Sequence, residues 1–246
     1  MKKSVTILVP AYNEEKNLND TVNNINSALK NFISDYEILV FDDCSKDRTG
    51  EIADELAKKD SRIKVIHNPR NMGLGYNYRR AIQLASNEFF IMVVGDNDLS
   101  SKEIRFILSH IGRADVVIPY HMNEKTARPF LRLFISKTFI HLMNILVGLD
   151  LRAYTTMVLH RTKLLKQIDI TTDSFAYQPE ILSKLLKSGN NFMEIGINYA
   201  DDEESRETKF FKIKNFIGIF RTISHLFWLI RISERRTYNK RPIRIK

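Results

Sequence analysis

Five short apolar runs, each separated from the next by a helical pattern, dominate the first 120 residues. The strand-like runs cover 5–12, 36–43, 62–68, 89–96 and 115–120, and the helical segments cover about 14–31, 47–59, 73–86 and 100–111. Runs that are apolar throughout are typical of parallel strands buried on both faces. The alternation therefore predicts an α/β fold with a mostly parallel central sheet and helices on both of its faces.

Polar residues gather where three of these runs end. The segments are PAYNE at 10–14, DDCSKD at 42–47 and GDNDLS at 95–100. Ligands of such sheets bind at the carboxyl ends of the strands. We therefore expect the functional site where these three segments converge.

Asp96 and Asp98 stand on alternate positions just after an apolar run. Two carboxylates at this spacing suit a hard cation, Mg²⁺ or Mn²⁺, that keeps several waters and bridges to substrate phosphates. The alternative is a helix N-cap, with Asp98 or Ser100 capping the helix that begins near Ser101. Capping explains one acid but not two, and both interpretations stay open at this point.

Asp42 and Asp43 close the second run, where a carboxylate accepts hydrogen bonds from a base or a ribose hydroxyl in nucleotide sites. Capping of the next helix by Ser45 or Asp47 is the alternative. Gly73 opens a later helix, and its backbone allows a phosphate of the nucleotide to approach the helix N-terminus. The segment lacks the third glycine of a dinucleotide fingerprint, and the chain has no P-loop lysine motif, which argues against both classes.

The pattern changes after residue 120. Residues 129–149 predict an apolar helix with a narrow polar strip of Lys137, His141 and Asn144, while Arg132 and Ser136 share the opposite, apolar side. A buried core helix is the alternative. A strand is expected within 153–161, a helix over 175–188 and a strand over 192–199.

The net charge of +9 is concentrated at the C-terminal end of the chain. Residues 209–246 hold eleven Lys or Arg and one acid, a net charge of +10, which leaves −1 for residues 1–208. The pattern of residues 213–232 predicts an amphipathic helix. Its uninterrupted apolar stretch is too short to span a bilayer. We expect a main domain over 1–208 and, over 209–246, an interfacial helix with a basic tail on an anionic membrane surface. Interleaved Phe, Trp and Ile argue against nucleic acid as the partner.

The lone Cys44 fits a reducing compartment, and the N-terminus lacks the apolar core of a signal peptide. These features predict a peripheral protein on the cytoplasmic side of the membrane.

Four ordered motifs carry a resemblance to a known family. PAYNEEKN, DDCSKDRT, NPRNMGLGYNYRRAI and GDNDLS resemble the family 2 glycosyltransferases, in the branch that makes dolichyl- or polyprenyl-phosphate sugars. The resemblance implies the GT-A fold, a Rossmann-like arrangement. It also implies transfer of a sugar from a nucleotide diphosphate sugar to a lipid phosphate.

The resemblance assigns a role to each matching position of the donor half. Asp96 and Asp98 would bind the divalent metal and the diphosphate, with Asp98 central to catalysis. With Gly73, the residues expected to bind the nucleotide sugar are Pro10, Ala11, Tyr12, Glu14, Asp42, Asp43 and Asp96.

The acceptor half departs from the family pattern. Arg132 and Ser136 look like the R-x-x-x-S element that receives the lipid phosphate, and Glu180 resembles an acid facing the sugar, with an ordinary surface Glu as the alternative. Arg206 and Lys209 are further cations for that phosphate. The segment 153–158 lacks the Asp and Gly of its family counterpart, 205–209 lacks a Gly, and position 100 is Ser where several relatives have Gln.

These features favour a metal-dependent, inverting transferase whose polyprenyl- or dolichyl-phosphate acceptor attacks without a general base. One alternative is transfer to a hydroxyl of a cell-surface polysaccharide or lipid-linked glycan. Another is a catalytically impaired membrane-bound scaffold of the same fold. A homo-oligomer and a separate membrane-protein partner both stay open.

Overall fold

A computed structural model describes residues 3–97, 99–123, 130–172, 177–198 and 236–245, with a few positions between 224 and 233. The chain forms two compact units. Unit 1 is Met1–Asp115 with Met157–Gln167, and unit 2 is Val116–Thr156 with Ile168–Lys246.

Unit 1 is built on a sheet whose strands match the apolar runs of the sequence. The parallel strands, in spatial order, are β3 (Ile63–His67), β2 (Asp35–Asp42), β1 (Ser4–Ala11) and β4 (Phe89–Met92). A short strand, β6 (Leu159–Arg161), pairs antiparallel with β4. β1 and β2 are buried after their first residue, because helices cover both faces.

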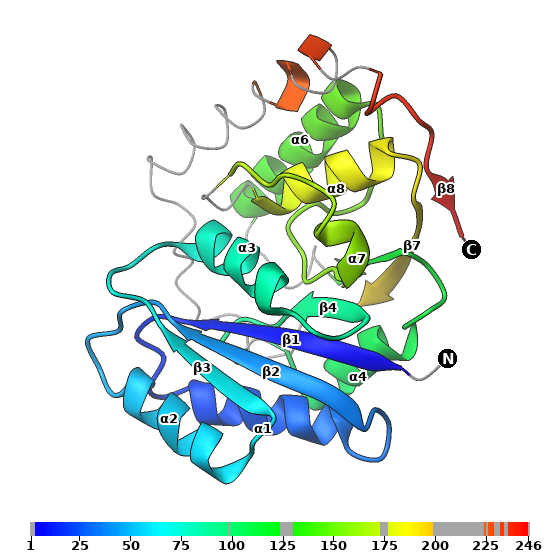
Figure 1. Ribbon diagram of the computed structural model, residues 1–246. Helices are drawn as coiled ribbons and strands as arrows, with labels where there is room; N and C mark the ends of the chain where they lie inside the picture. Colours follow the sequence, from blue (N-terminus) through cyan, green and yellow to red (C-terminus); the bar gives the residue numbers. More distant parts are fainter. Residues whose placement is uncertain are drawn as a thin grey trace. The chain divides into compact units, whose positions relative to one another are not determined.

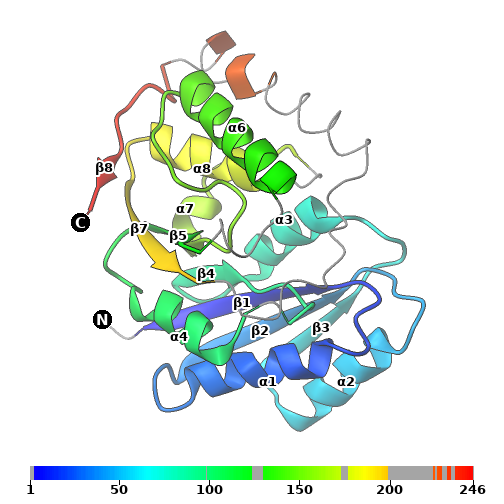
Figure 2. The same cartoon turned by 180° about the vertical axis from the view of Figure 1, so that it is seen from behind.

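The helices of unit 1 lie between the strands in sequence and pack on the sheet. They are α1 (Leu18–Leu29), α2 (Thr49–Lys59), α3 (Leu74–Leu84), α4 (Ser101–Ser109) and the short α7 (Thr162–Leu165). α1 and α2 cover one face and α3 covers the other (Figures 1 and 2). The expectation of an α/β unit with helices on both faces is confirmed.

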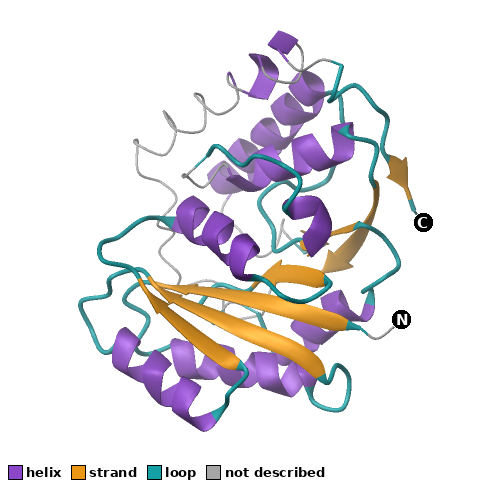
Figure 3. Ribbon diagram, viewed as in Figure 1, coloured by secondary structure: helices purple, strands orange, loops and turns teal. Residues whose placement is uncertain are grey.

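Unit 2 has its own parallel pairs of strands. β5 (Val116–His121) pairs with β7 (Asn191–Ile197), and β7 pairs with β8 (Ile243–Arg244). Its helices are α6 (Phe130–Val147) and α8 (Tyr177–Lys187); Figure 3 shows the elements by type. β8 comes from the basic C-terminal segment, so the end of that segment is part of a sheet and not only a surface tail.

Two predicted elements differ from the structure. The run 89–96 forms a strand only to Met92, and a turn follows, which takes Asp96 out of the strand. Only Leu159–Arg161 of the segment 153–161 is a strand. β6 pairs with β4 through His160 and Arg161, whereas the amides of Val93 and Gly95 still donate to β1 beyond the end of β4.

The buried-core interpretation of the helix at 129–149 is wrong. In α6 the side chains of Phe134 and Ile145 are 60% and 59% exposed, whereas Met143 and Val147 are each 1% exposed. No helix in the described part of the chain has the length and apolar character needed to cross a bilayer. Most of the amphipathic segment 213–232 lies outside the described residues.

Candidate functional site

The three polar segments identified in the sequence meet at the carboxyl ends of neighbouring strands in the sheet of unit 1. Ala11 and Asp42 are partners in the register of β1 and β2, so both strands end side by side. The amide of Asp43 donates to Ala11 O at 2.9 Å, and the amide of Gly95 donates to Pro10 O at 3.1 Å. The backbone of Pro10 and Ala11 is thus held between the second and third segments.

Among the described residues, each of these segments contains one with a left-handed backbone. The φ angles are +57° at Asn13, +64° at Cys44 and +60° at Asn97. This region is uncommon for residues other than glycine, and such residues concentrate at functional sites. The backbone therefore marks the same three loops that the sequence pattern marks.

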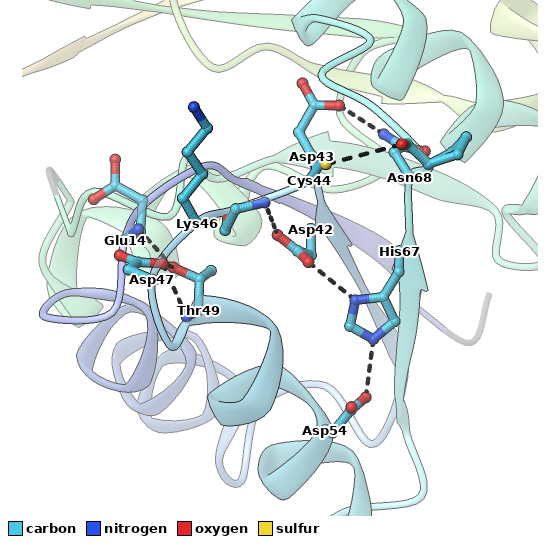
Figure 4. A network of polar contacts seen from close by, with 12 residues as sticks. Glu14, Asp42, Asp43, Cys44, Lys46, Asp47, Thr49, Asp54, His67 and Asn68 are labelled. Carbon is cyan, nitrogen blue, oxygen red and sulfur yellow. Dashed lines mark hydrogen bonds and ion pairs between the residues drawn. The ribbon is translucent and has the colours of Figure 1, made fainter.

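The first and second loops are joined by reciprocal hydrogen bonds. The amide of Asn13 donates to Ser45 Oγ at 3.0 Å, and the amide of Lys46 donates back to Asn13 Oδ1 at 2.8 Å. The amide of Glu14 donates to Thr49 Oγ1 at 2.8 Å (Figure 4). The side chain of Tyr12 stays 36% exposed at this edge. The two loops therefore form one preorganised wall of the site.

Asp43 holds the loop between β3 and α3. Its Oδ1 accepts from Asn68 Nδ2 and from the amide of Met72, both at 2.8 Å, and its Oδ2 accepts from the amide of Gly73 at 2.9 Å. The Gly73 amide thus donates to Asp43, and the approach of a nucleotide phosphate to this helix N-terminus stays a prediction. The sequence did not reveal that Asp43 holds this loop, because the groups that donate hydrogen bonds to it lie at least 25 residues further along the chain.

Asp42 is bound on both oxygens as well. Its Oδ1 accepts from the amide of Ser45 at 3.0 Å, and its Oδ2 lies 3.0 Å from His67 Nδ1. The other ring nitrogen of His67 lies 3.1 Å from Asp54 Oδ1 (Figure 4). Burial favours a raised pKa for Asp42, but the bonds from Ser45 and His67 outweigh it and lower the pKa. No motif singled out His67 or Asp54 in the sequence.

The helix that follows the third segment is capped by Ser100. Its Oγ accepts from the amide of Glu103, and the carboxylate of Glu103 accepts from the amide of Ser100, a reciprocal capping box. Ser100, one of the two candidate caps considered from the sequence, is therefore the N-cap of α4. Asp98 lies outside the described residues.

Asp96 is the described member of the predicted metal pair, half-buried in the turn after β4. Its neighbour Asn97 accepts from Asn24 Nδ2 of α1 at 2.8 Å, which fixes the turn against the helix. A carboxylate here fits a hard cation such as Mg²⁺ or Mn²⁺. The described residues contain no cluster of three ionisable metal ligands. A cation bound beside Asp96 would keep several waters and take further ligands from the substrate phosphates, as Mg²⁺ commonly does.

The predicted acceptor residues belong to unit 2 or lie outside the described residues. Ser136 is half-buried in α6, and Arg132 lies in the first turn of the same helix, although its side chain is not among those described. Arg206 and Lys209 lie outside the described residues.

Glu180 is not a surface residue, so that alternative is wrong. It is 0% exposed, and Lys184 Nζ lies 2.6 Å from its Oε1. It also accepts from the amides of Thr171 and Thr172 at 3.0 and 2.9 Å. Burial favours a raised pKa for Glu180, but these bonds lower it. The carboxylate anchors the segment 171–172 to α8.

The divergent segment 153–158 follows residues that are tied to α6. Asn144, from the predicted polar strip, donates to Leu151 O and accepts from the Leu151 amide, at 2.9 and 3.0 Å. The buried Tyr154 hydroxyl donates to Asn144 Oδ1 at 2.8 Å. Asn144 is therefore a structural anchor of this segment.

The sequence matches the model of glycosyl transferase family 2 over residues 6–132. EpsJ of Bacillus subtilis, described as an uncharacterized glycosyltransferase, is 40% identical over 97 residues, which are 39% of this chain and 27% of EpsJ. The polyprenol monophosphomannose synthase of Mycolicibacterium smegmatis is 27% identical over 209 residues, 80% of this chain and 77% of the synthase. The chain thus spans under a third of the first relative and about three quarters of the second.

The fold also matches solved structures. One is glucosyl-3-phosphoglycerate synthase from Mycobacterium tuberculosis, in complex with Mn²⁺, uridine diphosphate and phosphoglyceric acid. The TM-score is 0.64 at 12% identity, over 92% of this chain and 78% of the other. At this identity the likeness concerns the fold, and the mostly parallel α/β fold implied by the resemblance is confirmed.

Proposed function

The chain belongs to glycosyl transferase family 2, and from this premise we propose that it transfers a sugar from a nucleotide diphosphate sugar to a polyprenyl phosphate. One observation supports a donor site in particular. The loops at the carboxyl ends of neighbouring strands in unit 1 bring together five residues: Tyr12, Glu14, Asp42, Asp43 and Asp96. The acceptor half draws on the name of a relative, a polyprenol monophosphomannose synthase.

In the proposed donor site, the loops after β1 and β2 hold the nucleoside and the turn with Asp96 faces the diphosphate. Asp42 and Asp43 mainly hold the loops of the site in place and do not chiefly bind the nucleotide, since their oxygens accept hydrogen bonds from the backbone amides of those loops. Asp96 would hold a divalent cation, which would supply positive charge to the departing diphosphate. The protein contributes preorganised loops around it.

In the proposed reaction, an oxygen of the acceptor phosphate attacks the anomeric carbon as the bond to the diphosphate breaks, so the configuration inverts. A phosphate monoester is already anionic near neutral pH, whereas a hydroxyl acceptor needs a base. Glu180, the buried acid considered for the sugar pocket, is committed to Lys184 and to two amides. This commitment supports an acceptor that needs no base. Arg132 and Ser136 on α6 are proposed to receive the phosphate, and docking on the cytoplasmic membrane surface brings the lipid within reach.

The donor proposal predicts a metal-dependent ligand effect. UDP-, GDP-, dTDP- and CDP-sugars with Mn²⁺ are screened by thermal shift, on the wild type, on Asp96→Asn and on Asp20→Asn, an exposed acid of α1. We expect one nucleotide class to raise the Tm of the wild type and of Asp20→Asn, but to have little effect on Asp96→Asn. A Tm raised equally in all three proteins, or in none, would refute the donor site.

The acceptor is tested by its product. Incubation with the donor identified in the screen and a polyprenyl phosphate is expected to give an acid-labile sugar phosphate. An acid-stable glycosidic product would indicate a hydroxyl acceptor instead. Retained anomeric configuration would contradict the single displacement.

A further inference from the structure

His67 lies between two carboxylates from different elements. Its Nδ1 is 3.0 Å from Asp42 Oδ2, and its Nε2 is 3.1 Å from Asp54 Oδ1. Asp42 ends β2 and Asp54 belongs to α2, so the imidazole joins a strand end to a helix (Figure 4). A neutral imidazole carries one N–H donor and the protonated form carries two. Only the protonated form donates to both carboxylates.

The pair of His67 and Asp42 is in close contact with the start of α2. A Cβ added at Gly50 would lie 3.0 Å from Asp42 Oδ2 and 3.3 Å from His67 Cε1. The charged groups that face the imidazole are Asp42 from β2 and Asp54 from α2. The His67 side chain is 46% exposed, so its proton exchanges with solvent.

A chain of hydrogen bonds leads from His67 to the first loop of the donor site. Asp42 accepts from the Ser45 amide at 3.0 Å, and Ser45 Oγ accepts from the Asn13 amide at 3.0 Å. Asn13 stands between Tyr12 and Glu14. His67 is therefore linked by three successive hydrogen bonds to the loop proposed to hold the nucleoside.

We propose that His67 is a positioning residue of the donor site, whose proton holds Asp42 and, through Asp42, the loop 44–48 in the conformation that binds the nucleotide. The inference rests on the proposed function and adds proton-dependent control of donor binding to it. When the proton leaves, one nitrogen of His67 presents a lone pair to a carboxylate, and one of the two contacts is lost. The loop 44–48 then loses part of its support.

The direction of the pH effect follows from the two contacts. The hydrogen bond to Asp42 raises the pKa of His67, burial opposes it, and the bond to Asp54 adds to the rise. The protonated form is thus the one that the fold stabilises. Donor binding is tightest below the pKa of His67 and weakens as the pH rises through it.

The test compares nucleotide affinity with pH in matched variants. Kd values for UDP, GDP, dTDP and CDP, each with Mn²⁺, are measured by calorimetry between about pH 5.5 and 8.5. In the wild type we expect the Kd to rise about tenfold across this range, the worth of one ordinary hydrogen bond. In His67→Gln the Kd stays nearly constant, because the side chain no longer titrates. In Asp54→Asn the rise moves to lower pH, and His141→Gln, at an exposed position of α6, matches the wild type.

A second readout needs no ligand. In NMR spectra of the free wild type, the amides of Ser45 and Asn13 are expected to shift with the same midpoint as the His67 ring, and in His67→Gln they do not titrate. If His67→Gln binds the nucleotide with the same pH profile as the wild type, the inference about His67 is overturned but the proposed donor function is not. Failure of all four nucleotides to bind the wild type at any pH would overturn the donor function and the inference with it.

Discussion

The residues that shape the site are small and polar side chains with unusual backbone angles. Asn13, Cys44 and Asn97 adopt positive φ at three neighbouring strand ends. A left-handed backbone costs an L residue roughly 1–2 kcal/mol, and Asn bears less of this cost because its short amide bonds locally. At Asn97 the amide oxygen accepts from Asn24, so the angle and the contact support one another.

Substitution of Asn97 separates the backbone angle from the hydrogen bond. Asn97→Ala and Asn97→Gly both lose the bond from Asn24, but only Ala disfavours a φ of +60°. We expect Asn97→Ala to be about 1 kcal/mol less stable than Asn97→Gly. Urea unfolding of the two variants measures the difference, and equal stabilities would contradict the role of the angle.

At the scale of elements, apolar periodicity predicted where most strands and helices of unit 1 lie, because each run is buried between two helical layers. It did not predict that β4 stops at Met92 or that β6 is only three residues long, since both depend on pairing across the sheet. The polar segments that follow three of the strands were likewise predicted from the sequence. The reciprocal bonds between loops were not, because their partners are separated by about 30 residues.

A buried acid joins three strands at the other end of the same sheet. Glu37 of β2 accepts from Thr6 of β1, Lys64 of β3 and the Ser86 backbone, each at 2.7 Å. Burial favours a raised pKa for Glu37, but the bond from Lys64 and those from Ser86 and Thr6 lower it to about 2. The charged form therefore stabilises the folded sheet.

Glu37→Gln should lower the free energy of unfolding by about 2 kcal/mol at neutral pH, the worth of a charged hydrogen bond. A carboxyl with a depressed pKa stabilises the fold above its unfolded pKa, and this contribution disappears as the pH falls through about 2. The difference between wild type and variant should therefore be largest above about pH 5 and shrink steadily in acid.

Urea unfolding at several pH values tests this dependence. Glu51→Gln is the matched control, because Glu51 pairs with Arg48 at an exposed position and surface pairs contribute little. A difference that stays constant with pH would show that Glu37 acts through packing and not through charge.

At the scale of the whole molecule, the residues proposed to bind the donor come from three neighbouring strand ends, so the sheet order brings them together. The acceptor candidates are spread over α6, α8 and positions outside the described residues. The basic C-terminal segment also differs from a simple tail. β8 pairs with β7, and Arg244 lies 3.3 Å from Glu194.

The predicted membrane attachment through this segment is best tested without deleting it, since truncation would remove β8. Arg236, Lys240 and Arg241 are exposed and basic. Replacing all three with Gln should weaken binding to anionic vesicles roughly hundredfold, at about 1 kcal/mol for each charge. Cosedimentation with vesicles measures the effect. The triple replacement of Lys30, Lys58 and Lys59, exposed in unit 1, is the control, and an equal loss in both would indicate a general charge effect.

Unit 1 is assembled from two separate stretches of chain, and this has a consequence for synthesis. β6, within Met157–Gln167, pairs with the edge of β4. While the ribosome is still translating unit 2, the nascent first unit presents that edge without β6. Unpaired edges are where new chains aggregate. We therefore expect unit 1 to complete its folding only after residue 167 has emerged, and a stalled or truncated nascent chain to depend on chaperones until then.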